Sequence, residues 1–145
     1  IEKEFPIMVG TFTKSQLLDG ENKWKYDKDG KYYDIEKSYN IWKFPKILII
    51  HLKRFNNDGT KINNLIDFPI DNLDLTPYCV GYDKNKSFFS LIGICNHIGS
   101  NNSGHYYSYC KKKDGWYKFD DTNVNSINES KLITKNAYCL FYKKN

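Results

Sequence analysis

The fold is decided by residues 87–121, which have the sequence SFFSLIGICNHIGSNNSGHYYSYCKKKDGWYKFDD. This stretch contains three apolar segments, at 87–97, 106–111 and 116–119, and they are separated by polar connections with Gly and Asn. Short runs rich in aromatic residues and bounded by turn residues are typical of β-strands. Because short connections join antiparallel neighbours, the pattern predicts a β-meander.

Strand signals also lie on either side of the meander. The strongest one is Lys46 to Phe55, whose continuous apolar run predicts a strand buried on both faces. His51 lies inside this run and is expected to be a buried, hydrogen-bonded histidine. A closing strand is expected at 137–142.

Two short helices are expected outside the strands. The first is Lys14 to Asp19, with Thr13 as its N-cap and Gly20 after its end. The second is Asn128 to Ile133. With an aromatic share of 17% and twelve tyrosines spread among the apolar runs, the composition favours a β-rich globular unit of 145 residues.

The net charge of +5 raises the question of nucleic acid, since clustered basic residues supply the part of such binding that is independent of sequence. Here the lysines are scattered, and the short group at 111–113 adjoins a turn at Asp114 and Gly115. The aromatic residues coincide with strands that should form a core, so they are poor candidates for stacking on bases. We therefore expect no nucleic-acid partner.

Four cysteines, Cys79, Cys95, Cys110 and Cys139, are far apart and form no C-x-x-C pair. This spacing favours buried structural thiols in a reducing compartment. The longest purely apolar stretch, Ile47 to Ile50, is too short to cross a bilayer, and no signal-peptide pattern is present. We expect a soluble intracellular protein, cytoplasmic or nuclear, without a membrane partner.

His105 and Asp120 form the candidate chemical site. If the strands on either side of Asp114 and Gly115 pair, His105 near the start of one approaches Asp120 at the end of the other. A carboxylate beside an imidazole orients it and stabilises the imidazolium, as a general base in nucleophilic catalysis requires. Spacing alone leaves the alternative open that His105 is an ordinary core or surface residue and the Asp pair belongs to a turn.

Further motifs resolve this ambiguity. The sequence resembles the ubiquitin-specific protease family of cysteine deubiquitinases over roughly residues 14–142, and its motifs follow the order of that family. The matching pieces are IWKFPKILIIHLKRF at 41–55, DFPIDNLDL at 67–75, NHIGSNNSGHYYSYC at 96–110, WYKFDD at 116–121 and AYCLFY at 137–142. The resemblance implies a papain-like α+β fold, mostly antiparallel β, with residues 1–145 forming its C-terminal palm and fingers.

The resemblance also implies roles for individual residues. His105 is similar to the catalytic base, Asp120 to the third triad member and Asp121 to the adjacent polar residue that assists the site. Gly104 would let the C-terminal tail of ubiquitin approach the backbone, since glycine has no Cβ.

Three further residues are expected near that tail. Tyr106 resembles the aromatic residue beside the channel for the terminal glycines of ubiquitin, and Phe55 the one that borders the groove. Either could equally be ordinary core. A turn at 56–60 would open a mobile loop, and His97 to Ser103 would form a second flexible loop over the tail. His97 itself is expected to be a structural or hydrogen-bonding residue within the binding region.

The chain departs from the family pattern in two respects. None of its cysteines matches the family nucleophile, which lies upstream, so residues 1–145 are expected to lack the thumb and to be inactive alone. The zinc-binding thiolates of the family's fingers would fall on Tyr26 and Asp29, which cannot provide them. We therefore expect a fingertip without metal, and no cofactor.

The expected activity is hydrolysis of the bond after the C-terminal glycine of ubiquitin, by a cysteine outside this chain. The expected partners are ubiquitin or ubiquitinated proteins and the missing N-terminal half of the same domain. A catalytically inactive ubiquitin-binding module, with the same sheet and groove, is the alternative.

Overall fold

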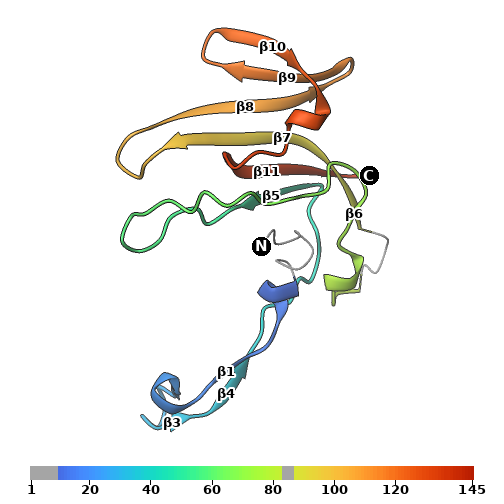
Figure 1. Ribbon diagram of the computed structural model, residues 1–145. Helices are drawn as coiled ribbons and strands as arrows, with labels where there is room; N and C mark the ends of the chain where they lie inside the picture. The colour runs from blue at the N-terminus through green and yellow to red at the C-terminus, as the bar shows by residue number, and fades with distance from the viewer. Residues whose placement is uncertain (1–9, 83–86) are drawn as a thin grey trace.

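The computed structural model describes residues 10–82 and 87–145, and it is dominated by one antiparallel sheet (Figure 1). The strand order is β10-β9-β8-β7-β11-β5, and the short β6 also pairs with β7. The strands of this sheet are β5 (Ile47–His51), β6 (Leu73–Asp74), β7 (Phe88–Gly99), β8 (Gly104–Lys112), β9 (Gly115–Asp120), β10 (Asn123–Ile127) and β11 (Ala137–Lys144). The predicted fold class, mostly antiparallel β, is confirmed.

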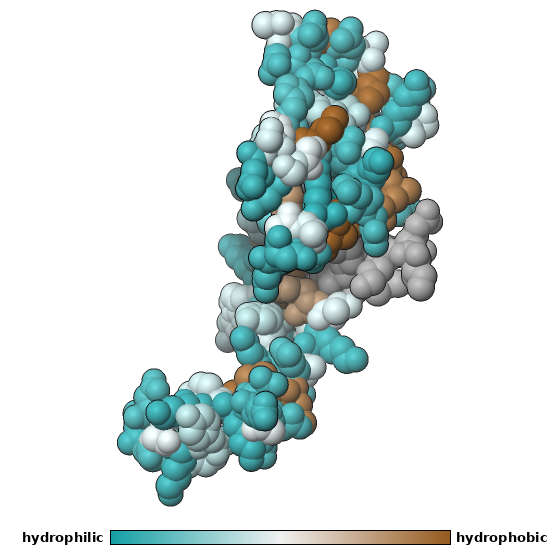
Figure 2. All heavy atoms as spheres, turned by 60° about the vertical axis from the view of Figure 1, so that its left-hand side comes forward, coloured by the Kyte–Doolittle hydropathy of each residue, from teal (hydrophilic) through white to brown (hydrophobic). Residues whose placement is uncertain are grey.

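A narrow ribbon projects from this sheet, and we call it the finger (Figure 1). It consists of two strand pairs, β1 with β4 and β2 with β3. In the side view of Figure 2 its surface is mostly hydrophilic. The strands are β1 (Gln16–Leu18), β2 (Trp24–Lys25), β3 (Tyr32–Tyr33) and β4 (Ile35–Lys37).

The predicted meander is confirmed in β7, β8 and β9, which are consecutive neighbours in the sheet. The closing strand is also confirmed, because β11 lies between β7 and β5. Strand β10 was not predicted. Its residues, NVNSI, are mostly polar and exposed, so this edge strand lacks the apolar alternation that marks a half-buried one.

The predicted helix at Lys14 to Asp19 is wrong. Residues 10–13 are helical, with Thr13 at the end of the turn, and Gln16–Leu18 then forms β1 by pairing with Ile35–Lys37. Pairing between distant segments overrides the local helix signal here. The second prediction is confirmed as a shorter 3-10 helix, Glu129–Lys131, whose N-cap Asn128 accepts a hydrogen bond from the Ser130 amide. The other 3-10 helices are Gly20–Asn22 and Thr76–Tyr78. Among the described residues, no helix is long and apolar enough to cross a membrane.

Strand β5 is buried on one face only, contrary to prediction. It lies at the sheet edge, where Leu48 and Ile50 are half-buried while Ile47 and Ile49 are 45% and 59% exposed. His51 shares the exposed face and is itself exposed, with its ring against Tyr138 at a centroid distance of 4.7 Å. The apolar run correctly predicted the strand, but nothing in the described part of the chain covers its second face.

The sheet as a whole has one covered and one uncovered face. The core lies on the covered face and includes Leu52, Phe68, Leu75, Leu91, Ile94, Tyr109, Leu132 and Leu140. On the other face, the strand register places half-buried Phe141 between Gly93 and Ile49. Three of the four free thiols, Cys95, Cys110 and Cys139, share this face and are half-buried rather than buried. This face is therefore apolar and is not covered by the described residues.

Arg54, the only arginine of the chain, is 2% exposed and lies directly after the exposed Lys53. Its Nε donates to the Ala137 carbonyl at 3.0 Å, and one terminal nitrogen donates to the carbonyls of Ile62 and Asn64 at 3.3 and 2.6 Å. Burial lowers the pKa of Arg54. The guanidinium thus joins the segment after β5 to the start of β11.

We expect Arg54→Met to destabilise the domain by about 2 kcal/mol, because it leaves buried carbonyl oxygens without donors. Lys53→Met is the matched control, since Lys53 is exposed, and it should change stability little. Denaturant unfolding of the whole protein measures both. Equal midpoints for the two variants would contradict a structural role for Arg54.

Candidate active site

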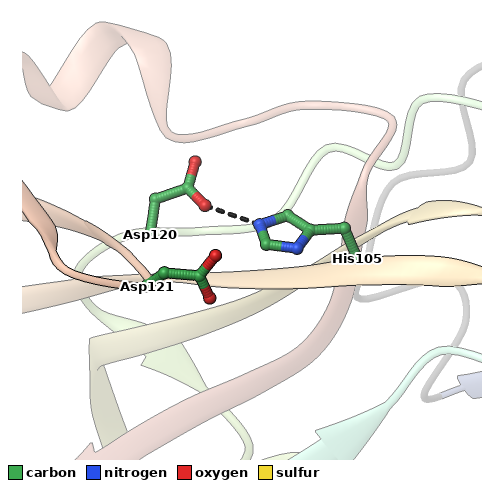
Figure 3. A group of neighbouring side chains, drawn as sticks. All are labelled: His105, Asp120 and Asp121. Carbon is green, nitrogen blue, oxygen red and sulfur yellow. Dashed lines mark hydrogen bonds and ion pairs between the residues drawn. The ribbon is translucent and has the colours of Figure 1, made fainter.

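The β8–β9 hairpin brings His105 and Asp120 together. The paired residues Ser108 and Phe119 fix its register, so Asp120 lies across from Tyr107, and His105 is one step further along the same face. The Nε2 atom of His105 lies 2.6 Å from Oδ1 of Asp120 (Figure 3). The predicted hydrogen bond is present, and its use of Nε2 leaves Nδ1 as the ring nitrogen that can meet a thiol.

The electrostatics of this pair suit an acid–base site. The hydrogen bond with Asp120 is the main cause of a raised His105 pKa, and the charges of Asp120 and Asp121 add to it. The pKa of Asp120 is lowered, first by its hydrogen bond with Lys118 and then by that with His105. Asp120 therefore remains ionised at neutral pH and can stabilise an imidazolium.

Asp121 lies in the turn between β9 and β10, next to the pair (Figure 3). Its φ of 50° is in the left-handed region, which Asp tolerates better than most residues. One ligand-type atom from each of His105, Asp120 and Asp121 falls within 4.8 Å of the others. Within the described ranges no other group of this kind occurs, and one half-buried and one exposed carboxylate give no separate argument for a metal.

His97 belongs to β7, as the apolar segment 87–97 predicted, and not to the predicted flexible loop. It is 3% exposed, which suits the structural residue that was expected. Its ring lies 4.6 Å from that of Tyr106 and 5.8 Å from that of Phe55. Burial, and next the charge of Lys61, lower the pKa of His97, so it is a neutral packing residue. Its predicted contact with substrate stays a prediction.

Gly104 is required by this packing. A Cβ at Gly104 would overlap the His97 ring and lie 2.8 Å from the Ile98 carbonyl oxygen. The sequence interpretation attributed Gly104 to the approach of substrate, whereas the contact inside the chain is with His97. Since Gly104 directly precedes His105, the buried ring sets the position of the candidate base.

The two residues predicted to border the substrate tail differ in exposure. Tyr106 is 54% exposed, and Phe55 is half-buried. Both pack against Tyr138, with ring centroids 6.0 and 6.3 Å away. Tyr138 was not predicted, because its motif, AYCLFY, indicated only a strand. The exposed ring of Tyr106 remains available to a ligand.

The two predicted loops lie beside each other. The first is a tight turn, in which the Asn56 amide donates to the Thr60 carbonyl at 3.0 Å. The second is confined to residues 100–103, because His97 to Gly99 belong to β7. Lys61, directly after the first turn, donates from Nζ to the His97 carbonyl of β7 at 2.6 Å. Sequence reasoning missed this contact, since nothing distinguishes Lys61 from the other lysines.

The fingertip is held by hydrogen bonds and ring packing. The Gly30 amide donates to the Tyr26 carbonyl at 2.8 Å, and the Asp29 carboxylate accepts from the Tyr33 hydroxyl at 2.6 Å. The rings of Trp24 and Tyr26 lie 5.3 Å apart. Tyr26 and Asp29, predicted to replace zinc-binding thiolates, therefore take part in the turn itself.

Comparison with known proteins places this geometry in a family. The family model described as "Ubiquitin carboxyl-terminal hydrolase" matches residues 5–142. Ubiquitin carboxyl-terminal hydrolase 15 of Rattus norvegicus is 34% identical over 141 residues, covering 94% of this chain and 15% of the relative. Ubiquitin carboxyl-terminal hydrolase 31 of Homo sapiens is 32% identical over 160 residues, covering 92% of this chain and 12% of the relative.

Solved structures of similar fold support the same family. The SAGA DUB module of Ubp8, Sgf11, Sus1 and Sgf73 bound to monoubiquitin contains a chain with a TM-score of 0.82 and 32% identity. The match covers 99% of this chain and 33% of that one. The same module bound to ubiquitin aldehyde has a TM-score of 0.80 and 31% identity, with 99% and 34% covered.

The match is extensive for this chain and partial for its relatives. The chain spans about one seventh of the length of the first curated relatives and a third of the solved Ubp8-module chains. The residues of the hairpin site all lie inside the matched range. The chain belongs to the ubiquitin carboxyl-terminal hydrolase family, as part of a ubiquitin-specific protease catalytic domain.

Proposed function

We propose that the whole protein is a cysteine-type deubiquitinase that hydrolyses the bond after the C-terminal glycine of ubiquitin. The main support is the hydrogen bond of 2.6 Å between His105 Nε2 and Asp120, which leaves Nδ1 for a nucleophile. Further support comes from the family, because relatives of this chain are ubiquitin carboxyl-terminal hydrolases. The similar SAGA DUB module was solved bound to monoubiquitin. The enzyme acts inside the cell, where its free thiols remain reduced.

In this mechanism the nucleophilic cysteine comes from chain outside residues 1–145. His105 takes the thiol proton, the thiolate attacks the carbonyl carbon of the terminal glycine, and the protonated His105 donates to the leaving amine. A thioester results, and His105 then deprotonates the water that hydrolyses it. Asp120 orients the ring and stabilises the imidazolium, with additional negative charge from Asp121. The proposed chemistry requires no cofactor.

The tail of ubiquitin is proposed to pass along the region of Phe55, Gly104 and Tyr106. Tyr106 offers an exposed aromatic surface, and Phe55 packs beside the turn at 56–60. The buried ring of His97 packs against the rings of Tyr106 and Phe55 and so stabilises this region. Apolar rings on a packed base suit an extended, glycine-rich peptide that brings little side-chain area of its own.

The direct test is turnover of a fluorogenic ubiquitin conjugate by the full-length protein, together with a separate titration of ubiquitin binding. Turnover that depends on His105 supports the hydrolase. Binding without turnover would instead support the inactive ubiquitin-binding module.

We further propose that residues 1–145 form one part of the catalytic domain and that the preceding part packs on the uncovered sheet face and extends past the start of β8 to His105, whose side chain lies on the opposite face. Half-buried Phe141 and exposed Ile49 on this face favour contact with another apolar layer. The face also contains Cys95, Cys110 and Cys139, whereas Cys79 lies elsewhere, with its thiol 3.3 Å from the Trp42 carbonyl oxygen.

The docking proposal predicts a pattern of thiol protection. In the full-length protein, the three thiols on the sheet face should be alkylated much more slowly in the native state than after denaturation, because the docked layer excludes the reagent. Cys79 is the internal control, and we expect far less protection for it. Mass spectrometry after timed alkylation measures each site. Equal protection of Cys110 and Cys79 would contradict docking on this face.

A further inference from the structure

We propose that Lys118 is a positioning residue for the catalytic pair, because its ammonium group holds one oxygen of Asp120 and so keeps the other oxygen on His105. This inference rests on the proposed function and adds a residue to its site. Lys118 lies on β9, two positions before Asp120 and therefore on the same face of the strand.

The two oxygens of the Asp120 carboxylate have different partners, the Lys118 ammonium group and the His105 ring. Lys118 Nζ lies 2.6 Å from Oδ2, and His105 Nε2 lies 2.6 Å from Oδ1. In Figure 3 the oxygen that does not bond to His105 points away from the ring. Contacts at both oxygens restrict rotation of the carboxylate about its last bond, so Oδ1 stays directed at the imidazole.

Lys118 is itself held in place by the core. Its Nζ lies 4.6 Å from the centroid of the Tyr107 ring, a distance suited to a cation–π contact. Tyr107 is 8% exposed, and its hydroxyl accepts a hydrogen bond from Asn136 at 3.1 Å. The order of contacts is thus from a buried ring to an ammonium group, then to a carboxylate and finally to the candidate base.

The charges around His105 give Lys118 a second effect. Asp120 and Asp121 both favour the protonated ring and raise the His105 pKa, whereas the charge of Lys118 opposes them. Lys118 therefore limits the rise in the His105 pKa and keeps more of the neutral base available near pH 7. The side chains of Lys118 and Asp120 are 36% and 28% exposed, so the ion pair should contribute little to stability.

The test measures kcat and KM against pH for the full-length protein carrying Lys118→Met or Lys118→Arg. Lys118→Met should lower kcat about threefold to tenfold with KM unchanged, and Lys118→Arg should restore most of the loss because it keeps the cation. Loss of the positive charge by itself raises the His105 pKa, so this effect moves the acid limb to higher pH in Lys118→Met.

Lys111→Met is a matched control. Lys111 also forms an ion pair, 3.6 Å from Asp71, and also lies over an aromatic ring, 5.9 Å from the centroid of Trp116, but it has no contact with Asp120 or His105 among those described. Its substitution should leave the pH profile unchanged. Profiles that coincide for Lys118→Met and the wild type would overturn the positioning role, as would equal losses in Lys118→Met and Lys118→Arg.

Failure of the Lys118 inference can be distinguished from failure of the proposed function. If His105→Ala is inactive and Lys118→Met is unchanged, only the Lys118 inference fails. If His105→Ala is fully active, the proposed function fails. An NMR titration of the His105 ring tests the charge effect of Lys118 without turnover, because loss of the positive charge by itself raises the His105 pKa. An unchanged pKa would remove the charge effect and leave the kcat comparison of Lys118→Met with Lys118→Arg as the test of positioning.

Discussion

In the full-length enzyme, His105→Ala should lower kcat for a fluorogenic ubiquitin conjugate by about 10⁴-fold, the upper end of what one general base contributes. Alanine cannot take the thiol proton or return it to the leaving amine, so both steps around the thioester slow down. Affinity for ubiquitin should be nearly intact, because it comes from a wide surface and His105 supplies only a small part of it.

Asp120→Asn should reduce turnover less than His105→Ala. The amide oxygen of Asn can still accept the hydrogen bond from Nε2, which preserves the ring orientation, but the negative charge that stabilises the imidazolium is lost. The sign of the pKa change follows: the His105 pKa falls in this variant, because its largest upward contribution comes from Asp120.

Turnover and binding have to be measured on the same preparations. Reduced kcat with an unchanged dissociation constant for ubiquitin is the result that supports a chemical role. Undiminished turnover in His105→Ala would remove the catalytic assignment and leave family membership as a statement of ancestry and fold. A parallel loss of binding and turnover would point instead to a folding defect in the variant.

The contact between His105 and Asp120 could be predicted because it depends only on a short hairpin. The turn lies at Lys113 and Asp114, one residue before the predicted Asp114 and Gly115, because Gly115 already pairs with Lys112. Alternation along the two strands then decides which side chains meet. Lys118 was not predicted as part of the site, although the same register determines its position. A lysine two residues before an aspartate is common on an exposed strand face, so its contact with the Tyr107 ring is what distinguishes it.

The errors have a different physical origin. An apolar run such as that of β5 indicates that a strand should be covered on both faces, but it cannot say whether the covering layer lies within the same 145 residues. His51 was misjudged for the same reason. The finger strand β1 exists only through pairing with β4, and its three residues have no strand periodicity of their own. Local signals fail where the stabilising partner is distant in sequence.

Gly104→Ala is the variant with the second-largest expected effect. An added methyl group at this position would overlap the His97 ring, which is fixed by its contacts with Tyr106 and Phe55, so the start of β8 has to move. His105 is the next residue, and a displacement of about 1 Å at a catalytic group can cost about 100-fold in rate. We therefore expect kcat to fall about 100-fold, with a smaller change in KM.

The double variant Gly104→Ala with His97→Ala identifies the cause. Removing the His97 ring makes room for the methyl group, so Gly104→Ala should cost much less kcat in the His97→Ala background than in the wild type. An identical loss of kcat in both backgrounds would mean that His97 is not the obstacle. The nearest remaining contact would then be the Ile98 carbonyl oxygen, 2.8 Å from the added Cβ. If Gly104→Ala instead raises KM at constant kcat, the methyl group obstructs the ubiquitin tail. Gly104 would then be needed for the approach of substrate and not for the position of His105. A change in KM alone means that the variant weakens binding of the ground state and the transition state equally, which leaves kcat unchanged.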